Sequence, residues 1–185
     1  SKCRIVTVRA GNCFGGGDWT KERIVKDSLE SFYNNKTLTL RMPEATRPWQ
    51  HVIEPLFGYI LLVQKLCSKN GKKYVGAWNF GPSLRQNLKV IKFAKMIKEK
   101  MNSKSKIVIK RNFGKLKSKK VKVFESKNLS INSSKVFKFL NWSPFLSIES
   151  AINLTIEWYK AFKKKQDLFY LTKIQILNYI KKTGS

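Results

Sequence analysis

The chain opens with an apolar, β-branched segment that runs directly into a glycine-rich loop. Residues 3–9 (CRIVTVR) are expected to form a strand of a covered parallel sheet, and the loop RAGNCFGGGDW follows at 9–19. Apolar residues at helical spacing then predict a helix over 20–34, with Asp18 or Thr20 as its N-cap. A strand, a glycine loop and a helix in this order are typical of the first unit of a dinucleotide-binding fold.

The spacing of the glycines does not fit that first unit. A dinucleotide fingerprint needs G-x-G-x-x-G, because one glycine makes the turn, one admits the pyrophosphate and one allows close helix–strand packing. The glycines here stand at 11, 15, 16 and 17, and the next expected strand ends in Arg41 and Met42 instead of an acidic residue for the ribose. Two interpretations stay open: a ligand-binding loop at the carboxyl end of a parallel strand, or a structural glycine turn.

The rest of the chain alternates between strand-like and helix-like segments, which predicts an α/β fold. The stretches 42–50 (MPEATRPWQ) and 114–120 (GKLKSKK) are expected to be loops. Further strands are expected at 37–42, 74–81 and 107–113, and further helices at 51–69, 88–101, 133–140, 147–165 and 172–182.

The cysteines and the histidine are too few for a metal site or a disulfide framework. Cys3, Cys13 and Cys67 form no C-x-x-C pair, and His51 is the single histidine. We expect no metal, and buried free thiols in a reducing cytoplasm. The longest apolar run, at 56–63, is far too short to span a membrane.

The net charge of +27 is distributed unevenly. Residues 1–60 carry nine basic and six acidic side chains, whereas residues 61–185 carry 29 and five. Of the 38 basic residues 31 are lysine, although proteins that read nucleic acids favour arginine forks. We therefore interpret the charge mainly as solvated lysine, and keep a basic nucleic-acid-binding module as the alternative from another class.

Three further segments point to a family: RPWQHVIEPLFGY at 47–59, WNFGP at 78–82 and LNWSP…TIEWY at 140–159. Together with RAGNCFGGGDW and the late pattern TKIQILNY, they resemble the C-terminal half of the CDP-glucose 4,6-dehydratases of the extended short-chain dehydrogenase/reductase family. The resemblance covers nearly all of residues 1–185. It implies the C-terminal part of an NAD-binding parallel-sheet domain plus a small α/β substrate-binding domain. Epimerases and decarboxylases of nucleotide sugars share part of these motifs and are the alternative within the family.

The resemblance also implies an activity for the full-length enzyme. That enzyme is expected to be a cytoplasmic homodimeric lyase of polysaccharide biosynthesis, which converts CDP-glucose to CDP-4-dehydro-6-deoxy-glucose with NAD. In the family, the NAD turn and the catalytic Tyr-x-x-x-Lys precede the matched region. NAD is therefore expected to be bound mainly by an N-terminal half, and this chain alone is expected to be inactive, with no catalytic residue of its own. Tyr159 and Lys163 have the same spacing, but their late position makes it a coincidence.

The family motifs assign three residues to the cofactor and the diphosphate. The main chain near Ala10 would lie beside the nicotinamide, and the Asn12 amide would orient a phosphate oxygen without adding charge. Arg47 would clamp two phosphate oxygens with its guanidinium. The alternatives are a loop-capping amide at Asn12 and a surface salt-bridge partner at Arg47.

Three more residues are assigned to the nucleotide. Arg23 and Arg41 would add positive charge near it, and Asn79, at a strand end, would contact it directly. The alternatives are a solvated helix arginine at Arg23 and an amide that satisfies loop main chain at Asn79. Tryptophans 49, 78, 142 and 158 are better explained by packing.

Overall fold

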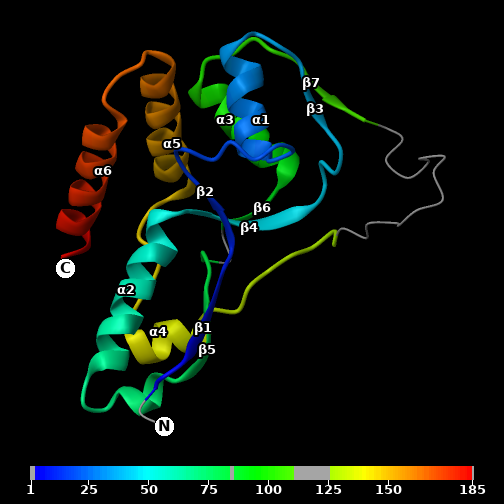
Figure 1. Ribbon diagram of the computed structural model, residues 1–185. Coiled ribbons are helices and arrows are strands. Elements are labelled where there is room, and N and C mark those ends of the chain that lie inside the picture. The colour runs from blue at the N-terminus through cyan, green and yellow to red at the C-terminus, as the bar shows by residue number, and fades with distance from the viewer. Residues whose placement is uncertain (1–2, 84–85, 111–125, 185) are drawn as a thin grey trace. The chain divides into compact units, whose positions relative to one another are not determined.

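A computed structural model describes residues 3–83, 86–110 and 126–184, which form the expected α/β fold (Figure 1). The basic stretch at 114–120 lies outside the described residues. The strands are β1 Val6–Ala10, β2 Asn12–Phe14, β3 Leu38–Leu40, β4 Thr46–His51, β5 Gly76–Phe80, β6 Asn87–Lys89 and β7 Ile107–Ile109. The helices are α1 Ile24–Tyr33, α2 Ile53–Cys67, α3 Val90–Lys100, α4 Ser134–Leu140, α5 Ile148–Lys163 and α6 Leu168–Thr183, with a 3-10 turn at Gly71–Tyr74.

The chain divides into two compact units. Unit 1 consists of Ser1–Gly17, Pro48–Asn87 and Ser130–Ser185, and unit 2 of Asp18–Arg47 and Leu88–Leu129. Three sheets are formed: β1 with β5, β2 with β4 and β6, and β3 with β7. The pairs β1–β5, β2–β4 and β3–β7 are parallel, as the alternation of strands and helices predicts.

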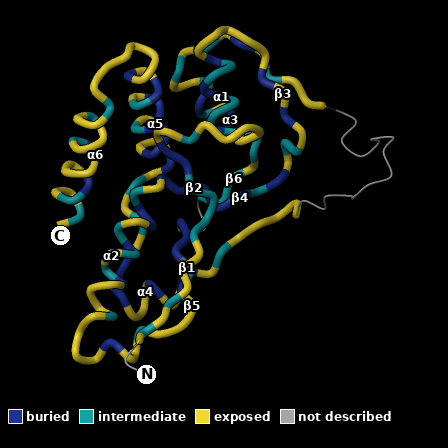
Figure 2. The backbone as a smooth tube through the Cα atoms, in the orientation of Figure 1, coloured by how far each residue is buried: buried dark blue, intermediate teal, exposed yellow. Residues whose placement is uncertain are grey.

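The core of unit 1 lies on one face of the β1–β5 pair. Trp78 and Phe80 of β5 point to the same side, because side chains alternate along a strand, and both are almost fully buried. They pack with Leu62 of α2 and Val136 of α4, so these two helices supply the apolar cover of that face. Figure 2 shows the contrast along the chain between these buried segments and the exposed parts of β1.

Helices α5 and α6 complete unit 1 as consecutive helices with side-chain caps. Ser147 accepts a hydrogen bond from the Ser150 amide at the start of α5, and Asp167 accepts one from the Tyr170 amide at the start of α6. The amide of Gln175 in α6 donates to Glu157 of α5 at 2.8 Å. The two caps define where each helix begins, and the bond between Gln175 and Glu157 links the two helices.

Unit 2 is built on the parallel pair β3–β7 with α1 and α3. The buried side chains of α1 are Val25, Leu29 and Phe32 beside Ser28, which confirms the apolar face that the helical spacing predicts. The equivalent face of α3 buries Phe93, Ala94 and Ile97. The two helices pack against each other, and Leu38 and Leu40 of β3 are buried as well.

The expectation of a loop over 42–50 was wrong, because Thr46–His51 forms strand β4. Trp49, Gln50 and His51 pair in parallel register with Asn12, Cys13 and Phe14 of β2. Five consecutive residues of β4 are buried, so the segment lacks the alternation by which a half-buried strand is recognised. Pro48 also argued against a strand on local grounds, and tertiary packing overrides that preference.

Two helix boundaries differ from the expected ones. Helix α1 begins at Ile24 instead of residue 20, and Arg23 is its N-cap residue without a side-chain hydrogen bond. Asp18 instead accepts a hydrogen bond from the amide of Thr20, which makes a local turn before the helix. Helix α6 begins at Leu168, four residues before the expected start, because Asp167 caps it.

Candidate functional site

Asn79 stands near the carboxyl end of β5 and is held by two hydrogen bonds. Its Oδ1 accepts from Nη1 of Arg9 at 3.2 Å, and its Nδ2 donates to the carbonyl of Asn132 at 3.1 Å. Arg9 and Asn79 are also register partners across the β1–β5 pair. The side chain therefore ties two strand ends to the segment before α4, which is the structural alternative named for it.

Ala10 and Asn12 lie where the chain passes from the β1–β5 sheet to the sheet of β2 and β4. Ala10 is the last residue of β1 and pairs with Phe80, and Asn12 begins β2 and pairs with Trp49. Between them, the Gly11 amide donates to the Phe80 carbonyl at 3.1 Å. Both residues are half-buried at the carboxyl end of a parallel strand, where ligand sites of α/β proteins form.

Arg47 is buried, with 6% of its surface exposed, and is not a surface residue. Its Nη1 donates to the carbonyl of Thr46 at 2.8 Å and lies 3.5 Å from the carbonyl of Lys127. A guanidinium keeps its charge when buried. Its burial argues against a position on the exposed surface.

Arg23 and Arg41 are exposed residues of unit 2. Nη1 of Arg41 lies 2.9 Å from Oε2 of Glu22, the residue that precedes Arg23. Because both partners of this ion pair are exposed, it contributes little to stability. The structure thus brings Arg41 next to the segment that carries Arg23, and a carboxylate neutralises part of that positive charge.

The triple glycine is packed against helix α5. A Cβ at Gly16 would lie 2.2 Å from Cδ2 of Trp158, and Gly17 has a φ of +80°, so neither position accommodates a side chain. Trp158 in turn donates from Nε1 to Thr172 of α6 at 3.0 Å and stacks on Phe162. These contacts confirm a packing role for Trp158 and supply a structural reason for the glycines.

Beside the glycine loop, His51 is buried and neutral. Burial lowers the pKa of His51 to about 4, because the charged ring loses its hydration. Its Nδ1 accepts from the Ile53 amide at 3.3 Å, so the proton of the neutral ring is on Nε2. Burial raises the pKa of the neighbouring thiol of Cys13, which favours the protonated and unreactive form.

Two buried polar residues of the RPWQHVIEP segment were not predicted from the sequence. The Gln50 amide donates to the carbonyl of Phe80 at 2.9 Å and so joins the ends of β4 and β5. Glu54, which is 1% exposed, accepts hydrogen bonds from the amides of Phe145 and Leu146. Their positions inside that motif were the available signal, since polar residues amid an apolar run need buried partners.

The surroundings of Tyr159 and Lys163 support the interpretation of their spacing as a coincidence. Tyr159 is 3% exposed in the packed interior of α5, and Nζ of Lys163 lies 5.3 Å from its ring centroid. Lys163 therefore lies over the face of the ring.

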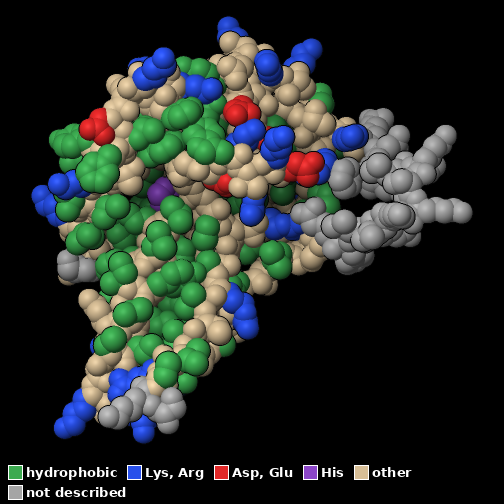
Figure 3. Space-filling model, in the orientation of Figure 1, with side chains coloured by type: hydrophobic (Ala, Val, Ile, Leu, Met, Phe, Trp, Pro, Cys, Tyr) green, Lys and Arg blue, Asp and Glu red, His purple; other side chains and the backbone are tan. Residues whose placement is uncertain are grey.

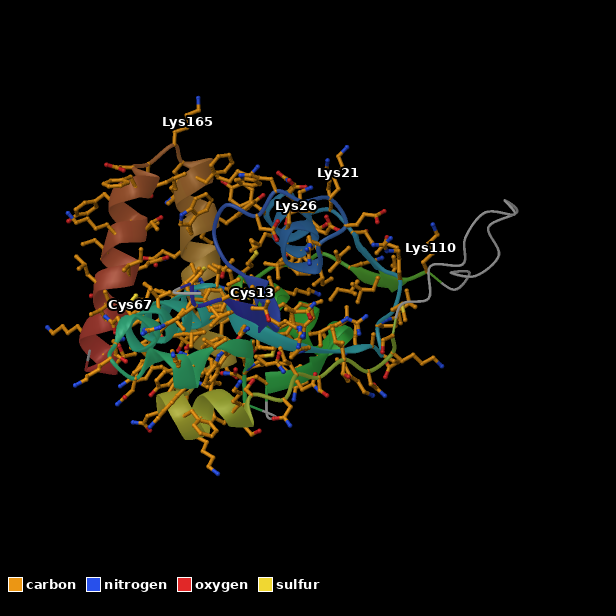
Figure 4. All side chains as sticks on the ribbon, turned by 60° about the horizontal axis from the view of Figure 1, so that its bottom comes forward. Cys13, Lys21, Lys26, Cys67, Lys110 and Lys165 are labelled. Carbon is orange, nitrogen blue, oxygen red and sulfur yellow. The ribbon has the colours of Figure 1, made fainter. Side chains whose placement is uncertain are left out.

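The expectation of buried thiols was wrong for two of the three cysteines. Cys3 and Cys67 are exposed, and Cys13 is half-buried; all three are free thiols (Figure 4). Among the described residues, no group of histidine, cysteine and acidic side chains could hold a metal ion. Within the same residues, no helix has both the length and the apolar character needed to cross a membrane.

Several lysines are exposed at the surface, as the sequence analysis expects for solvated lysines. Lys21, Lys110 and Lys165 are exposed, and their side chains point away from the ribbon in Figure 4. Others are used locally: Lys26 pairs with Glu30 at 2.9 Å, and Lys135 lies over the ring of Trp78. These arrangements are those of solvated or locally paired lysines.

Known structures share this fold. UDP-glucose 4-epimerase of Thermotoga maritima, solved with UDP-glucose, superposes with a TM-score of 0.68 at 18% identity, over 86% of this chain and 47% of that one. The dTDP-glucose 4,6-dehydratase of Bacillus anthracis, solved with NAD, superposes with a TM-score of 0.63 at 15% identity, over 87% and 46%. The fold is thus that of part of the nucleotide-sugar epimerases and dehydratases. No protein-family model matches the chain.

A sequence relative gives a narrower assignment. CDP-glucose 4,6-dehydratase of Salmonella typhimurium is 34% identical over 181 residues, which cover 97% of this chain and 47% of that enzyme. The chain is therefore a homologue of CDP-glucose 4,6-dehydratase and spans about half the length of this relative. The resemblance carried by RAGNCFGGGDW and RPWQHVIEP is confirmed.

Proposed function

We propose that the chain supplies the substrate-binding half of a nucleotide-sugar 4,6-dehydratase that acts on CDP-glucose. The observation that carries the proposal is the 34% identity to the Salmonella enzyme, which extends over 97% of this chain. The parallel strand ends that carry Ala10, Asn12 and Asn79 support it, because α/β proteins bind their ligands at such ends. In this proposal residues 1–185 correspond to the C-terminal half of the relative, and residues outside this range bind most of the NAD.

Arg47 is the residue that we propose to clamp the diphosphate. A guanidinium can bond two phosphate oxygens at once, and Arg47 stands at the arginine position of the RPWQHVIEP segment on which the resemblance rests. Asn12 would orient a second phosphate oxygen as a neutral donor. Arg23 and Arg41 would raise the positive potential for the nucleotide, with Glu22 as the ion-pair partner of Arg41.

Among the described residues, we propose one place of contact with NAD. A Cβ at Gly15 or Gly16 would meet Val52 or Trp158, so the glycines make room for the protein itself and not for a pyrophosphate. The backbone near Ala10, at the end of β1, is where we propose contact with the nicotinamide. NAD supplies the hydride acceptor when it is bound, and the other half of the enzyme would hold most of it.

The cellular location, the oligomeric state and the absence of a nucleic-acid partner are proposals as well. The three free thiols support a reducing cytoplasm as the location. We propose a homodimer for the full-length enzyme and no nucleic-acid partner, since the lysines described above are solvated or locally paired.

The binding of CDP-glucose tests the proposed clamp. The chain would be joined to the remaining half of the Salmonella dehydratase, and CDP-glucose would be titrated calorimetrically. We expect Arg47→Ala to weaken the affinity about tenfold to a hundredfold, because a hydrogen-bonded charge pair is lost. Lys89→Ala is the matched control: it removes one positive charge from an exposed pair with Glu44 in the same unit.

The fold of each variant is checked by thermal unfolding, since Arg47 is buried. Arg47→Lys, which keeps the charge and loses the fork, gives a second measurement if the alanine variant unfolds. An unchanged affinity in a folded Arg47 variant would remove this residue from the site.

A further inference from the structure

Helix α6 is attached to unit 1 through a face that carries hydrogen-bonding side chains. Thr172, Gln175 and Tyr179 recur at the three- and four-residue spacing of one helix face, and each is hydrogen-bonded within unit 1. Their partners are Trp158, Glu157 and Glu54. The buried residues of the helix are Gln175 and Tyr179. The inward face of α6 is therefore unusually polar.

The outward face of α6 is apolar instead. Its exposed side chains are Phe169 (80%), Tyr170 (62%), Ile176 (43%) and Leu177 (49%). At about 100° per residue these four positions fall within an arc of about 120°, which also holds Lys173. A surface helix ordinarily turns its apolar stripe toward the core. Exposed apolar groups that gather on one face mark an interaction surface.

Lysines stand within and beside this outward face. Residues 158–174 carry five lysines and one acid, Asp167, which caps α6. Lys164 and Lys165 are exposed between α5 and α6, and Lys173 is exposed within the face itself. These three lysines belong to none of the ion pairs found among the described residues. Figure 3 shows hydrophobic side chains and lysines side by side over the region of α6.

The surface of an anionic membrane matches both properties of this face. Apolar side chains enter the boundary of the acyl chains, while lysines keep their ammonium groups among the headgroups. The seven basic residues in the range 160–183 are all lysines, whose compact charges suit a fluid array of headgroups, whereas arginine forks suit fixed carboxylates. A second copy of this chain is disfavoured as the occupant, because its own lysines would face these lysines.

We propose that the outward face of α6, together with the lysines that precede the helix, binds the surface of an anionic membrane. The helix lies flat in the interface, with Phe169 and Tyr170 below the headgroups. Lys164, Lys165 and Lys173 contact the headgroups. This association requires no helix that crosses the membrane. It uses none of the residues proposed to bind the nucleotide sugar, so it is independent of the proposed function.

Vesicle flotation tests the apolar part of this contact. The whole chain would be mixed with vesicles of phosphatidylcholine and phosphatidylglycerol in equal parts, and its partition coefficient would be measured. We expect Phe169→Ala to lower the coefficient about tenfold, because the burial of an exposed phenyl ring is lost. Ile60→Ala is the matched control, since Ile60 is 58% exposed on α2 of the same unit. If the chain is poorly soluble, the joined protein described above takes its place.

The lysines need a control for overall charge, because a net charge of +27 attracts any part of the chain to anionic vesicles. The double variant Lys164→Gln/Lys165→Gln removes two charges beside α6. Lys72→Gln/Lys73→Gln removes two charges from exposed neighbours in the 3-10 turn of the same unit. We expect the first pair to weaken partition about tenfold and the second pair much less.

The outcomes separate the possible occupants of the face. Equal losses in the two lysine pairs would show that only overall charge acts, and would overturn the proposal. Unchanged partition of Phe169→Ala, or equal binding to vesicles of phosphatidylcholine alone, would do the same. Sedimentation velocity tests the second copy: dimers that Phe169→Ala dissociates, in a chain that does not bind the vesicles, would assign the face to self-association and refute membrane binding.

Discussion

The hydroxyl of Tyr179 donates a hydrogen bond of 2.7 Å to Oε2 of Glu54, across 125 residues of sequence. Glu54 stands in the first turn of α2, and Tyr179 belongs to the last turns of α6. The same carboxylate accepts the amides of Phe145 and Leu146. One buried acid thus fixes the C-terminal helix and the segment before α5 to the start of α2. Burial raises the pKa of Glu54 and of Tyr179, so the phenol keeps its proton and acts as the donor.

Removing the Tyr179 hydroxyl should destabilise unit 1. We expect Tyr179→Phe to lower the free energy of unfolding by about 1–3 kcal/mol, because a buried carboxylate loses a donor. Urea unfolding would measure it. Tyr170→Phe is the matched control, since Tyr170 is 62% exposed on the same helix and should change little. Equal effects of the two substitutions would show that the hydrogen bond contributes nothing.

Acid should destabilise the chain through His51. The folded state lowers the pKa of His51 from 6.5 to about 4, so the unfolded chain binds the proton more tightly between these values. Stability is therefore complete above pH 6.5 and falls as the pH decreases through this window. At 1.36 kcal/mol per pKa unit, the loss attributable to His51 approaches about 3 kcal/mol at the acid end.

The His51 contribution is isolated by His51→Asn, whose side-chain oxygen can accept from the Ile53 amide in place of Nδ1. Urea unfolding at several pH values would compare the two proteins. Glu54 acts in the opposite direction, because its raised pKa makes stability fall as the pH rises above its ordinary value. Glu54 is present in both proteins, so it cancels in the comparison. Parallel pH profiles would contradict the assignment to His51.

The glycine loop should be intolerant of a single methyl group. Gly16→Ala would place a carbon 2.2 Å from Cδ2 of Trp158, and we expect a loss of about 1–3 kcal/mol in the free energy of unfolding. The double variant with Trp158→Ala supplies the control, because removal of the indole opens the space. If Gly16→Ala costs as much in that background as in the wild type, packing on Trp158 is not the reason for the glycine.

Local pattern predicted most helices and the parallel strands of this fold. The apolar faces of α1 and α3 were evident, because each helix buries one face at helical spacing. Strand β4 was missed because burial on both sides hides the alternation, and Pro48 argues locally for a loop. The cap at Asp167 was readable in the sequence and would have placed the start of α6 correctly.

The site was predictable only in part, for physical reasons. A motif can locate Arg47 and Asn79 in the sequence, but not their partners: the buried position of Arg47 and the bonds of Asn79 to Arg9 and Asn132 depend on long-range packing. The role of Glu54 depends on Tyr179, which lies 125 residues away. The ligand assignments of Ala10, Asn12, Arg23, Arg41, Arg47 and Asn79 stay predictions.

The isolated chain should not dehydrate CDP-glucose. Tyr159 is buried under Lys163, and the glycine loop is filled by Trp158, so the described residues offer neither an acid–base pair nor a pyrophosphate cradle. Incubation with CDP-glucose and NAD, followed by mass spectrometry of the nucleotide sugar, would check this. Turnover by the chain alone would mean that it carries catalytic groups of its own.

The most direct measurement is the mass of the nucleotide sugar after incubation with NAD and the chain joined to the remaining half of the Salmonella dehydratase. If the chain is the substrate-binding half of a CDP-glucose 4,6-dehydratase, the product will be lighter than CDP-glucose by one water. A folded, NAD-binding protein that returns CDP-glucose unchanged in mass would contradict the account, and an epimerised sugar of equal mass would assign the chain to the epimerases instead.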